Sequence, residues 1–214
     1  MKALFLFLCF LFLFTISAAE EDAAVRDTDG DHLMAGNKYY IVPTLRGSGG
    51  GLLLSDYNSE GCEITVAQSG DKRNRGIPWS FHPADPAQTH INISESLNIK
   101  SVYPVACTGS IVWRIGSADS ASEGQLIQLA GSLGDPSCWP YTTTWFKIEK
   151  GKYQNSYKFV YNPEDICPEA TEDSNLSIGV GSGARTLVLP FNSRSRAFDF
   201  GIFKVRGSDR AYVQ

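Results

Sequence analysis

The stretch DTDGDHLMAGNKYYI, residues 27–41, allows two interpretations of this chain. It opens with three aspartates in five residues and ends in an aromatic run of the kind that favours a β-strand. An EF-hand calcium loop needs glycine at its sixth position and glutamate at its twelfth. Counted from Asp27, the sixth position is His32 and the twelfth is Lys38. The positive charge of Lys38 would repel the metal ion. We therefore interpret the aspartates as a turn, because Asp and Gly suit turns, leading into a first strand at 38–42.

The N-terminus has the features of a secretory signal peptide. Lys2 gives a positive start, residues 4–14 are uninterruptedly apolar, and small residues follow at 17–19. An apolar run of this length spans only about half of a bilayer core, so we expect cleavage before Glu20 and no anchor. Residues 1–19 are then the signal peptide and residues 20–214 one domain. The mature chain would be secreted, to the extracellular space or to the vacuole.

Composition narrows the possible partners of the mature chain. The formal net charge is −4 for the full sequence and −5 once Lys2 is lost with the signal peptide. No basic cluster or stripe occurs, which argues against a nucleic-acid partner. No segment after the signal is long and apolar enough to span a membrane, so no membrane contact is expected after cleavage. The sequence lacks the motifs of a serine-hydrolase elbow, a zinc protease and a phosphate-binding loop. We expect no cofactor, no metal and no enzymatic activity.

Four cysteines remain after the signal is removed: Cys62, Cys107, Cys138 and Cys167. An even number in a secreted chain indicates two disulfides, although four cysteines allow three pairings and spacing alone does not choose among them. The absence of a C-x-x-C pair argues against zinc or thioredoxin chemistry.

Short runs rich in β-branched and aromatic residues dominate the rest of the sequence, separated by Gly, Pro, Asn, Asp and Ser. We expect strands at 38–42, 51–55, 62–68, 110–116, 125–131, 144–150, 156–162, 175–180, 185–190 and 200–205. An aromatic strand, a polar link and an apolar strand recur from 39, 112 and 157 onwards. Three copies of such a unit favour an all-β barrel with threefold pseudo-symmetry, a β-trefoil.

The opening stretch also carries a family resemblance. With its neighbours it resembles the first motif of the plant Kunitz-type (soybean trypsin inhibitor) family, at Val25, Asp27, Asp29, Gly30, Asp31, Leu33, Tyr39 and Ile41. The stretches GGGL at 49–52, CEITVAQ at 62–68 and WFKIEKGKYQNSYKFVY at 145–161 resemble the family in the same order, and TLVL and FGIFKV resemble its closing strands. The resemblance implies a β-trefoil of roughly twelve strands in three pseudo-repeats.

The resemblance implies a secreted plant inhibitor of a hydrolase that fills its target's cleft with a substrate-like loop. The first candidate target is an endopeptidase of the serine type. Carrying over the specificity position gives Pro86, and a slip of one residue gives Asp85 or Ala87. No Lys or Arg occurs from 77 to 99, which argues against trypsin, whose pocket holds a carboxylate. Ala35 stands where many family inhibitors have an Asn that braces the loop.

Other functions stay open within the family. The alternatives are a storage or defence protein with an inactive loop, or an inhibitor of α-amylase or of a cysteine protease through another surface. The resemblance also implies a monomer whose partner is the target hydrolase.

The resemblance implies disulfides between Cys62 and Cys107 and between Cys138 and Cys167. Two sequons, at Asn92 and Asn175, are possible glycosylation sites, and Asn92 follows the candidate loop closely. His82 and His90 lie eight residues apart in the same region, and we expect them to have structural roles.

Overall fold

Strands dominate the part of the chain that the computed structural model describes, which is residues 23–56, 62–106, 108–134, 136–138, 141–181, 183–192 and 194–207. Within these ranges there is one 3-10 helix, Tyr141–Thr144, and no α-helix. The strands are β1 (Tyr39–Pro43), β2 (Leu52–Ser55), β3 (Thr65–Gln68), β4 (Pro78–Pro83), β5 (Leu97–Ser101), β6 (Val112–Asp119), β7 (Gly124–Gly131), β8 (Lys147–Lys150), β9 (Tyr157–Tyr161), β10 (Ser174–Asn175), β11 (Ser177–Gly181), β12 (Ala184–Pro190) and β13 (Phe200–Lys204).

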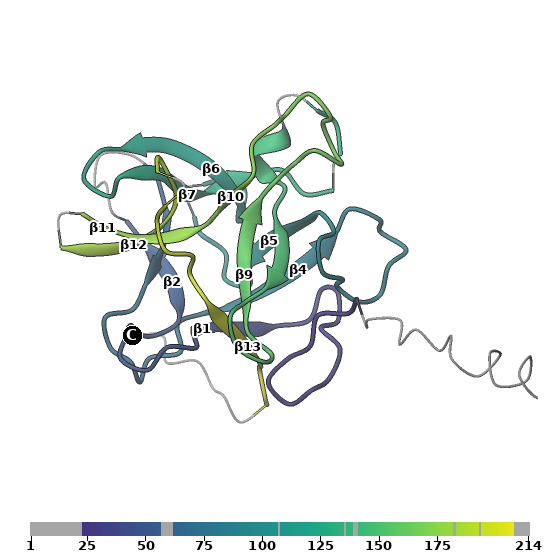
Figure 1. Cartoon of the computed structure of the whole chain (residues 1–214), viewed down its shortest axis with the longest axis horizontal. Coiled ribbons are helices and arrows are strands. Elements are labelled where there is room, and N and C mark those ends of the chain that lie inside the picture. Colours follow the sequence, from purple (N-terminus) through teal and green to yellow (C-terminus); the bar gives the residue numbers. More distant parts are fainter. Residues whose placement is uncertain are drawn as a thin grey trace, which may run out of the picture.

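Six of these strands close into a barrel (Figure 1). β1 pairs with β13 and β4, β4 pairs with β5, and β9 pairs with β8 and β13, all antiparallel. A bridge between Leu97 at the start of β5 and Phe146 beside β8 completes the ring. Closure leaves none of the six with a free edge, so none offers a template for pairing with another chain.

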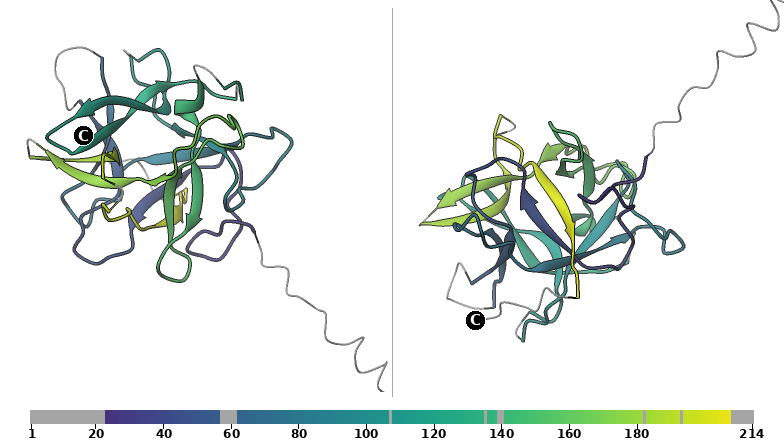
Figure 2. Two further views of the ribbon diagram at one scale, coloured as in Figure 1. Left: turned by 45° about the horizontal axis from the view of Figure 1, so that its top comes forward. Right: turned by 90° about the horizontal axis from the view of Figure 1, so that it is seen from below.

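Three hairpins cover one end of the barrel, namely β2–β3, β6–β7 and β11–β12. β3 pairs with β7, β7 with β12, and β12 with β3, so the hairpins meet in a triangle (Figure 2). The chain thus repeats one unit three times, as β1–β4, β5–β8 and β9–β13, with the two-residue β10 as an extra strand. This arrangement confirms the expected β-trefoil.

The expected strand list was wrong in one region, because it contained neither β4 nor β5. β4 alternates apolar Trp79 and Phe81, both fully buried, with polar Ser80 and His82, which is the period-two pattern of a strand. Its flanking prolines obscured that pattern, although a proline is tolerated at the first position of a strand. Without β5, the second repeat was placed at β6, one strand too late along the chain.

Large aromatic side chains fill the barrel interior. Trp113 lies edge-on to Trp79, Phe146 and Phe159, with ring centroids 5.1, 6.0 and 5.3 Å away, and Phe159 stacks on Phe200 at 4.2 Å. All five side chains are fully buried. Burial of each one stabilises the fold by about 1.5–3 kcal/mol. Because Trp79 belongs to β4, this core fixes the strand from which the candidate loop leaves.

The aspartates of the opening stretch form a turn. Asp27 is fully buried, and its Oδ1 accepts hydrogen bonds from the backbone N–H groups of Asp29 and Asp31, both at 3.0 Å. The carboxylates of Asp29 and Asp31 instead contact Arg206, at 2.8 Å, and Lys204, at 3.5 Å. The turn is thereby tied to the end of β13, and its carboxylates do not converge on one centre. Among the described residues, no three His, Cys, Asp or Glu side chains are grouped to hold a metal.

One disulfide, between Cys138 and Cys167, lies in the described part of the chain, with Cα atoms 4.8 Å apart. Cys62 is also disulfide-bonded, but Cys107 lies outside the described residues, so the Cys62–Cys107 pair stays a prediction. The predicted signal peptide, residues 1–19, lies outside them too. No helix in the described ranges is long and apolar enough to cross a bilayer.

Candidate inhibitory loop

The candidate loop, residues 84–96, joins β4 to β5. It projects on the right of the barrel in Figure 1, opposite the hairpin β11–β12, and the views in Figure 2 agree. The strand register brings its two ends together, with Pro83 opposite Leu97. The backbone N–H of Ala84 then donates to the carbonyl of Ser96 at 2.9 Å and closes the base of the loop.

The three residues expected to contact a target, Asp85, Pro86 and Ala87, lie together and exposed at the tip of this loop. The Asp85 carboxylate accepts a hydrogen bond from the Ala87 N–H at 2.9 Å, and the Asp85 carbonyl accepts one from the Gln88 N–H at 3.1 Å. This is a β-turn with aspartate first and proline second, a position that the fixed φ of proline suits. The tip is therefore a closed turn that satisfies its own backbone groups.

The N-terminal segment braces one limb of the loop through backbone hydrogen bonds. The Ala35 N–H donates to the carbonyl of Thr89 at 3.0 Å, and the Ile91 N–H donates to Leu33 at 2.9 Å. In the other direction, Val25 N–H donates to Ile91 at 2.8 Å. Ile91 is buried, which anchors this limb in the core. The loop thus has a brace at Ala35 that needs no side-chain amide.

Glu95 holds the loop together from within. Its Oε2 accepts a hydrogen bond from the side-chain amide of Gln88 at 2.6 Å, and its Oε1 accepts one from the amide of Asn92 at 3.1 Å. Glu95 could not be predicted from the sequence, because an acid seven residues from one amide and three from another has no sequence signature in a loop. The structure therefore adds Glu95 as a residue that positions the candidate loop.

The end of the loop is tied to the second and third repeats. Ser96, which is buried, donates from its hydroxyl to the carboxylate of Asp165 at 2.8 Å. The same carboxylate oxygen lies 3.1 Å from the ammonium of Lys147 in β8. The Ser94 N–H also donates to the carbonyl of Ile148 at 3.0 Å. With the N-terminal brace, these contacts fix the loop at both limbs while its tip stays exposed.

The two histidines of this region do not form a pair. His82 Nε2 lies 2.9 Å from the hydroxyl of Ser80, whereas His90 faces His32 with ring centroids 5.7 Å apart. Burial lowers the pKa of His82, and the positive charge of Lys100 lowers that pKa further. Ser80 is buried in the sheet and out of reach of a substrate, so its contact with His82 supports a structural role.

The two predicted glycosylation sites differ in their surroundings. Asn92 is half-buried in the candidate loop, and its Nδ2, the atom that would carry a glycan, donates to Glu95. Asn175 is half-buried in β10 opposite Val160. Glycosylation of either residue stays a prediction, and a glycan at Asn92 would stand beside the tip.

The chain resembles known plant proteins over most of its length. It matches a legume Kunitz family model, described as trypsin and protease inhibitor, over residues 25–201. It is 34% identical over 184 residues to miraculin from Synsepalum dulcificum, covering 82% of this chain and 81% of miraculin. It is 32% identical over 177 residues to Kunitz trypsin inhibitor 5 from Arabidopsis thaliana, covering 82% and 83%. A solved structure of a Kunitz-type cysteine protease inhibitor from potato superposes with a TM-score of 0.71 at 25% identity, covering 86% of this chain and 97% of that one. The chain therefore belongs to the plant Kunitz-type family of trypsin and protease inhibitors.

Proposed function

We propose that this protein inhibits an endopeptidase other than trypsin and that it engages this target with the loop 84–96. The observation that carries the proposal is an exposed tip, Asp85 to Ala87, on a loop fixed at both limbs. Limbs that are already ordered lose little conformational entropy on binding, so more of the contact energy is left for affinity and only the tip has to rearrange. Family membership makes a protease the first candidate target.

The chemistry of the tip argues for a small or apolar specificity pocket. The tip offers the ring of Pro86, the methyl group of Ala87 and the carboxylate of Asp85. Trypsin's pocket has an aspartate at its base, so it would repel the carboxylate and gain nothing from the other two. A hydrogen bond to a charged group is worth about 1.5–3 kcal/mol, so the missing cation costs about tenfold to a hundredfold in trypsin affinity. Elastase-like and subtilisin-like serine proteases fit the tip better.

The closed turn sets a condition on substrate-like binding. An extended peptide binds by forming main-chain hydrogen bonds with its partner. In the free protein, the Ala87 N–H and the Asp85 carbonyl are already occupied within the turn. Substrate-like occupation would therefore require the bond between Asp85 and Gln88 to open. The closed turn and the sequon at Asn92 favour a second candidate function, that of a storage or defence protein with an inactive loop.

A titration of the mature protein against a panel of hydrolases tests the proposal. The panel contains pancreatic elastase, subtilisin, chymotrypsin, trypsin, papain and α-amylase. We expect inhibition of elastase or subtilisin at a concentration at least ten times lower than that needed for trypsin. Inhibition of papain or α-amylase alone would move the function to another surface. Abundant accumulation in plant tissue with no inhibition across the panel would favour storage.

We further propose that the protein is secreted as a monomer after loss of residues 1–19. The support is the apolar run at 4–14 followed by small residues at 17–19. N-terminal sequencing of the protein produced in plant cells should begin at Glu20. Retention of Met1 in a membrane fraction would contradict the cleavage, and size-exclusion chromatography checks the oligomeric state.

A further inference from the structure

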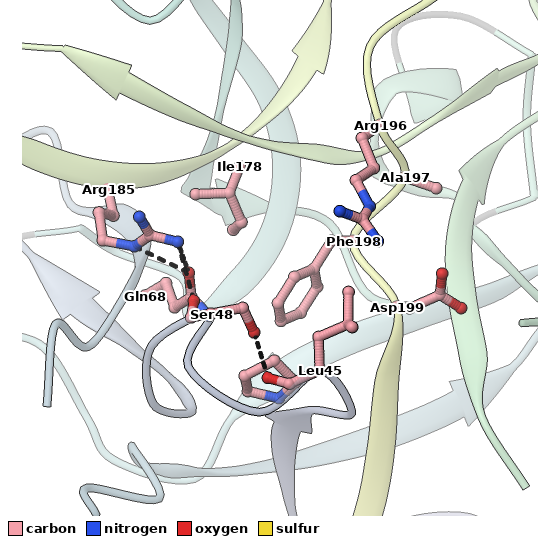
Figure 3. Close-up of a pocket in the computed structure, with 10 residues that line it drawn as sticks. Leu45, Ser48, Gln68, Ile178, Arg185, Arg196, Ala197, Phe198 and Asp199 are labelled. Atoms are coloured by element: carbon pink, nitrogen blue, oxygen red, sulfur yellow. Dashed lines mark hydrogen bonds between the residues drawn. The ribbon is translucent and has the colours of Figure 1, made fainter. Parts of the chain in front are cut away.

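A cavity of about 200 Å³ lies beside the hairpin β11–β12 (Figure 3). Its walls come from the link between β1 and β2, from the hairpin β11–β12, and from the segment just before β13. The residues that matter for its chemistry are Leu45, Ser48, Ile178, Arg185, Arg196 and Phe198. The hairpin β11–β12 projects on the side opposite the loop 84–96 in both figures of the whole chain (Figures 1 and 2).

The middle of this cavity is apolar. The side chains of Leu45, Ile178 and Phe198 line it, with Phe198 between the two arginines in the close-up (Figure 3). Phe198 is itself buried, and its ring stacks on that of Phe200 with centroids 5.7 Å apart. Because Phe200 belongs to the barrel core, the apolar wall is fixed and does not depend on a bound ligand for its shape.

Arg185 supplies a fixed positive charge at one side of the cavity. Its Nε and Nη2 donate to the side-chain carbonyl of Gln68, at 3.0 and 2.6 Å, and Nη2 also donates to the backbone carbonyl of Ser48 at 2.9 Å. Gln68 is buried and is held in turn by its bond to the carbonyl of Gly50 at 3.1 Å. All of these partners are neutral, so they orient the guanidinium without compensating its charge.

Arg196 supplies a second positive charge from the other side. Its side chain is exposed on the rim and makes no hydrogen bond or ion pair within the described part of the chain. Asp199 also lines the cavity, but its Oδ1 accepts a hydrogen bond from the Lys152 N–H at 3.0 Å. Two guanidinium groups against one carboxylate leave the cavity positive in a chain whose formal net charge is −4.

We propose that this cavity binds a small organic anion with one carboxylate on an apolar body the size of a single ring. A cavity of roughly 150 Å³ can hold benzene, so the present one has room for a ring and a carboxylate. Guanidinium groups match the planar geometry of a carboxylate and can bind it through two hydrogen bonds. The apolar wall at Ile178 and Phe198 would take the ring, and the guanidinium of Arg196 would bind the carboxylate. Arg185, whose Nε and Nη2 already donate to Gln68 and Ser48, would add the attraction of its positive charge from the other side.

Titration calorimetry of the full mature protein tests the proposal with benzoate as the probe and neutral benzamide as its matched control. We expect benzoate to bind at least tenfold more tightly than benzamide. The variant Arg196→Gln should weaken benzoate binding by about tenfold. Arg194 is exposed in the same segment but does not line the cavity, so Arg194→Gln is the matched control and should bind benzoate like the wild-type protein.

Three outcomes would overturn this proposal: no heat of binding with benzoate at millimolar concentration, equal affinity for benzamide, or an equal loss in Arg194→Gln and Arg196→Gln. The last would show that general surface charge, and not this cavity, attracts the anion. Far-UV circular dichroism shows whether each variant is folded. The result is independent of the inhibitor function, because the cavity lies beside the hairpin β11–β12, which projects opposite the loop 84–96.

Discussion

The side-chain amide of Gln88 donates to the carboxylate of Glu95 at 2.6 Å, and this contact joins the two limbs of the candidate loop. Glu95 uses its other oxygen for Asn92. One exposed acid thus holds two residues beside the tip, Gln88 and Asn92, without belonging to the tip. We therefore treat Glu95 as a positioning residue, whose loss should change the inhibition and leave the barrel intact.

The variant Glu95→Ala should weaken inhibition of the target protease about tenfold, which corresponds to roughly 1.4 kcal/mol for two screened hydrogen bonds to a charged group. The measurement is the inhibition constant against the most sensitive protease of the panel. Glu169→Ala is the matched control, since Glu169 is exposed outside the loop. Equal inhibition constants for both variants, with unchanged unfolding curves, would show that Glu95 does not order the tip.

Asp27 should contribute more to stability than either of the acids that follow it. Asp27→Ala leaves the N–H groups of Asp29 and Asp31 without their acceptor, and the free energy of unfolding should fall by about 1–3 kcal/mol. Asp29→Ala removes only an exposed ion pair with Arg206, so its cost should stay below about 1 kcal/mol. Urea unfolding of both variants measures the difference. A larger loss of stability in Asp29→Ala than in Asp27→Ala would mean that the ion pair with Arg206, and not the hydrogen bonds to Asp27, holds the turn.

His82 should make the protein less stable in mild acid. Burial and the charge of Lys100 lower its pKa in the folded state below the ordinary value of 6.5, so the unfolded chain binds the proton more tightly. The free energy of unfolding should therefore fall as the pH drops from about 6.5 to the lowered folded-state pKa. One proton limits the slope to about 1.4 kcal/mol per pH unit, and partial exposure of His82 reduces it.

Comparison with His82→Gln isolates this effect, because His32 and His90 are present in both proteins. Urea unfolding between pH 7.5 and 5 should give a shallower pH dependence for the variant. Parallel curves would show that His82 does not titrate differently in the folded and unfolded states.

The disulfide pattern gives a prediction that needs no variant. Non-reducing peptide mapping of the mature protein should yield a peptide that links Cys62 to Cys107 and another that links Cys138 to Cys167. The structure already joins the second pair, and parity of the four mature cysteines then leaves the first. A linked Cys107–Cys138 peptide would be incompatible with this arrangement.

The sequence predicted the fold because the trefoil is built from local signals. Asp27 marked the first turn, and the aromatic runs around Trp113 and Phe159 marked strands of two of the repeats. The sequence pattern did not predict β4, because a proline stands at each of its ends. It did not predict β5, because Asn98 within that strand looks like a loop residue. In the structure Asn98 is fully buried, and its amide donates to the carbonyl of Thr144 at 2.9 Å, a long-range contact with no local pattern.

The candidate site was predictable only in part. The resemblance placed Asp85, Pro86 and Ala87 in one loop, and the structure brings them together at its exposed tip. The closed turn could be foreseen from Asp-Pro, which favours turn initiation. The hydrogen bonds to Glu95 and the bond from Ser96 to Asp165 could not be predicted, because they join residues whose proximity depends on the folded barrel. The cavity between Arg185 and Arg196 depends in the same way on the meeting of separate segments.

The trypsin affinity of Pro86→Arg, alone and combined with Ala35→Asn, shows directly whether the loop 84–96 is a protease-binding loop. The matched control is Gln154→Arg, which adds the same charge at an exposed turn far along the chain. We expect at least the double variant to bind trypsin ten or more times as tightly as the wild-type protein and the control do, because a cation then reaches the carboxylate of trypsin's pocket. If the double variant binds trypsin no better than Gln154→Arg, the loop is not a protease-binding loop, and the inhibitor function must be abandoned or moved to another surface.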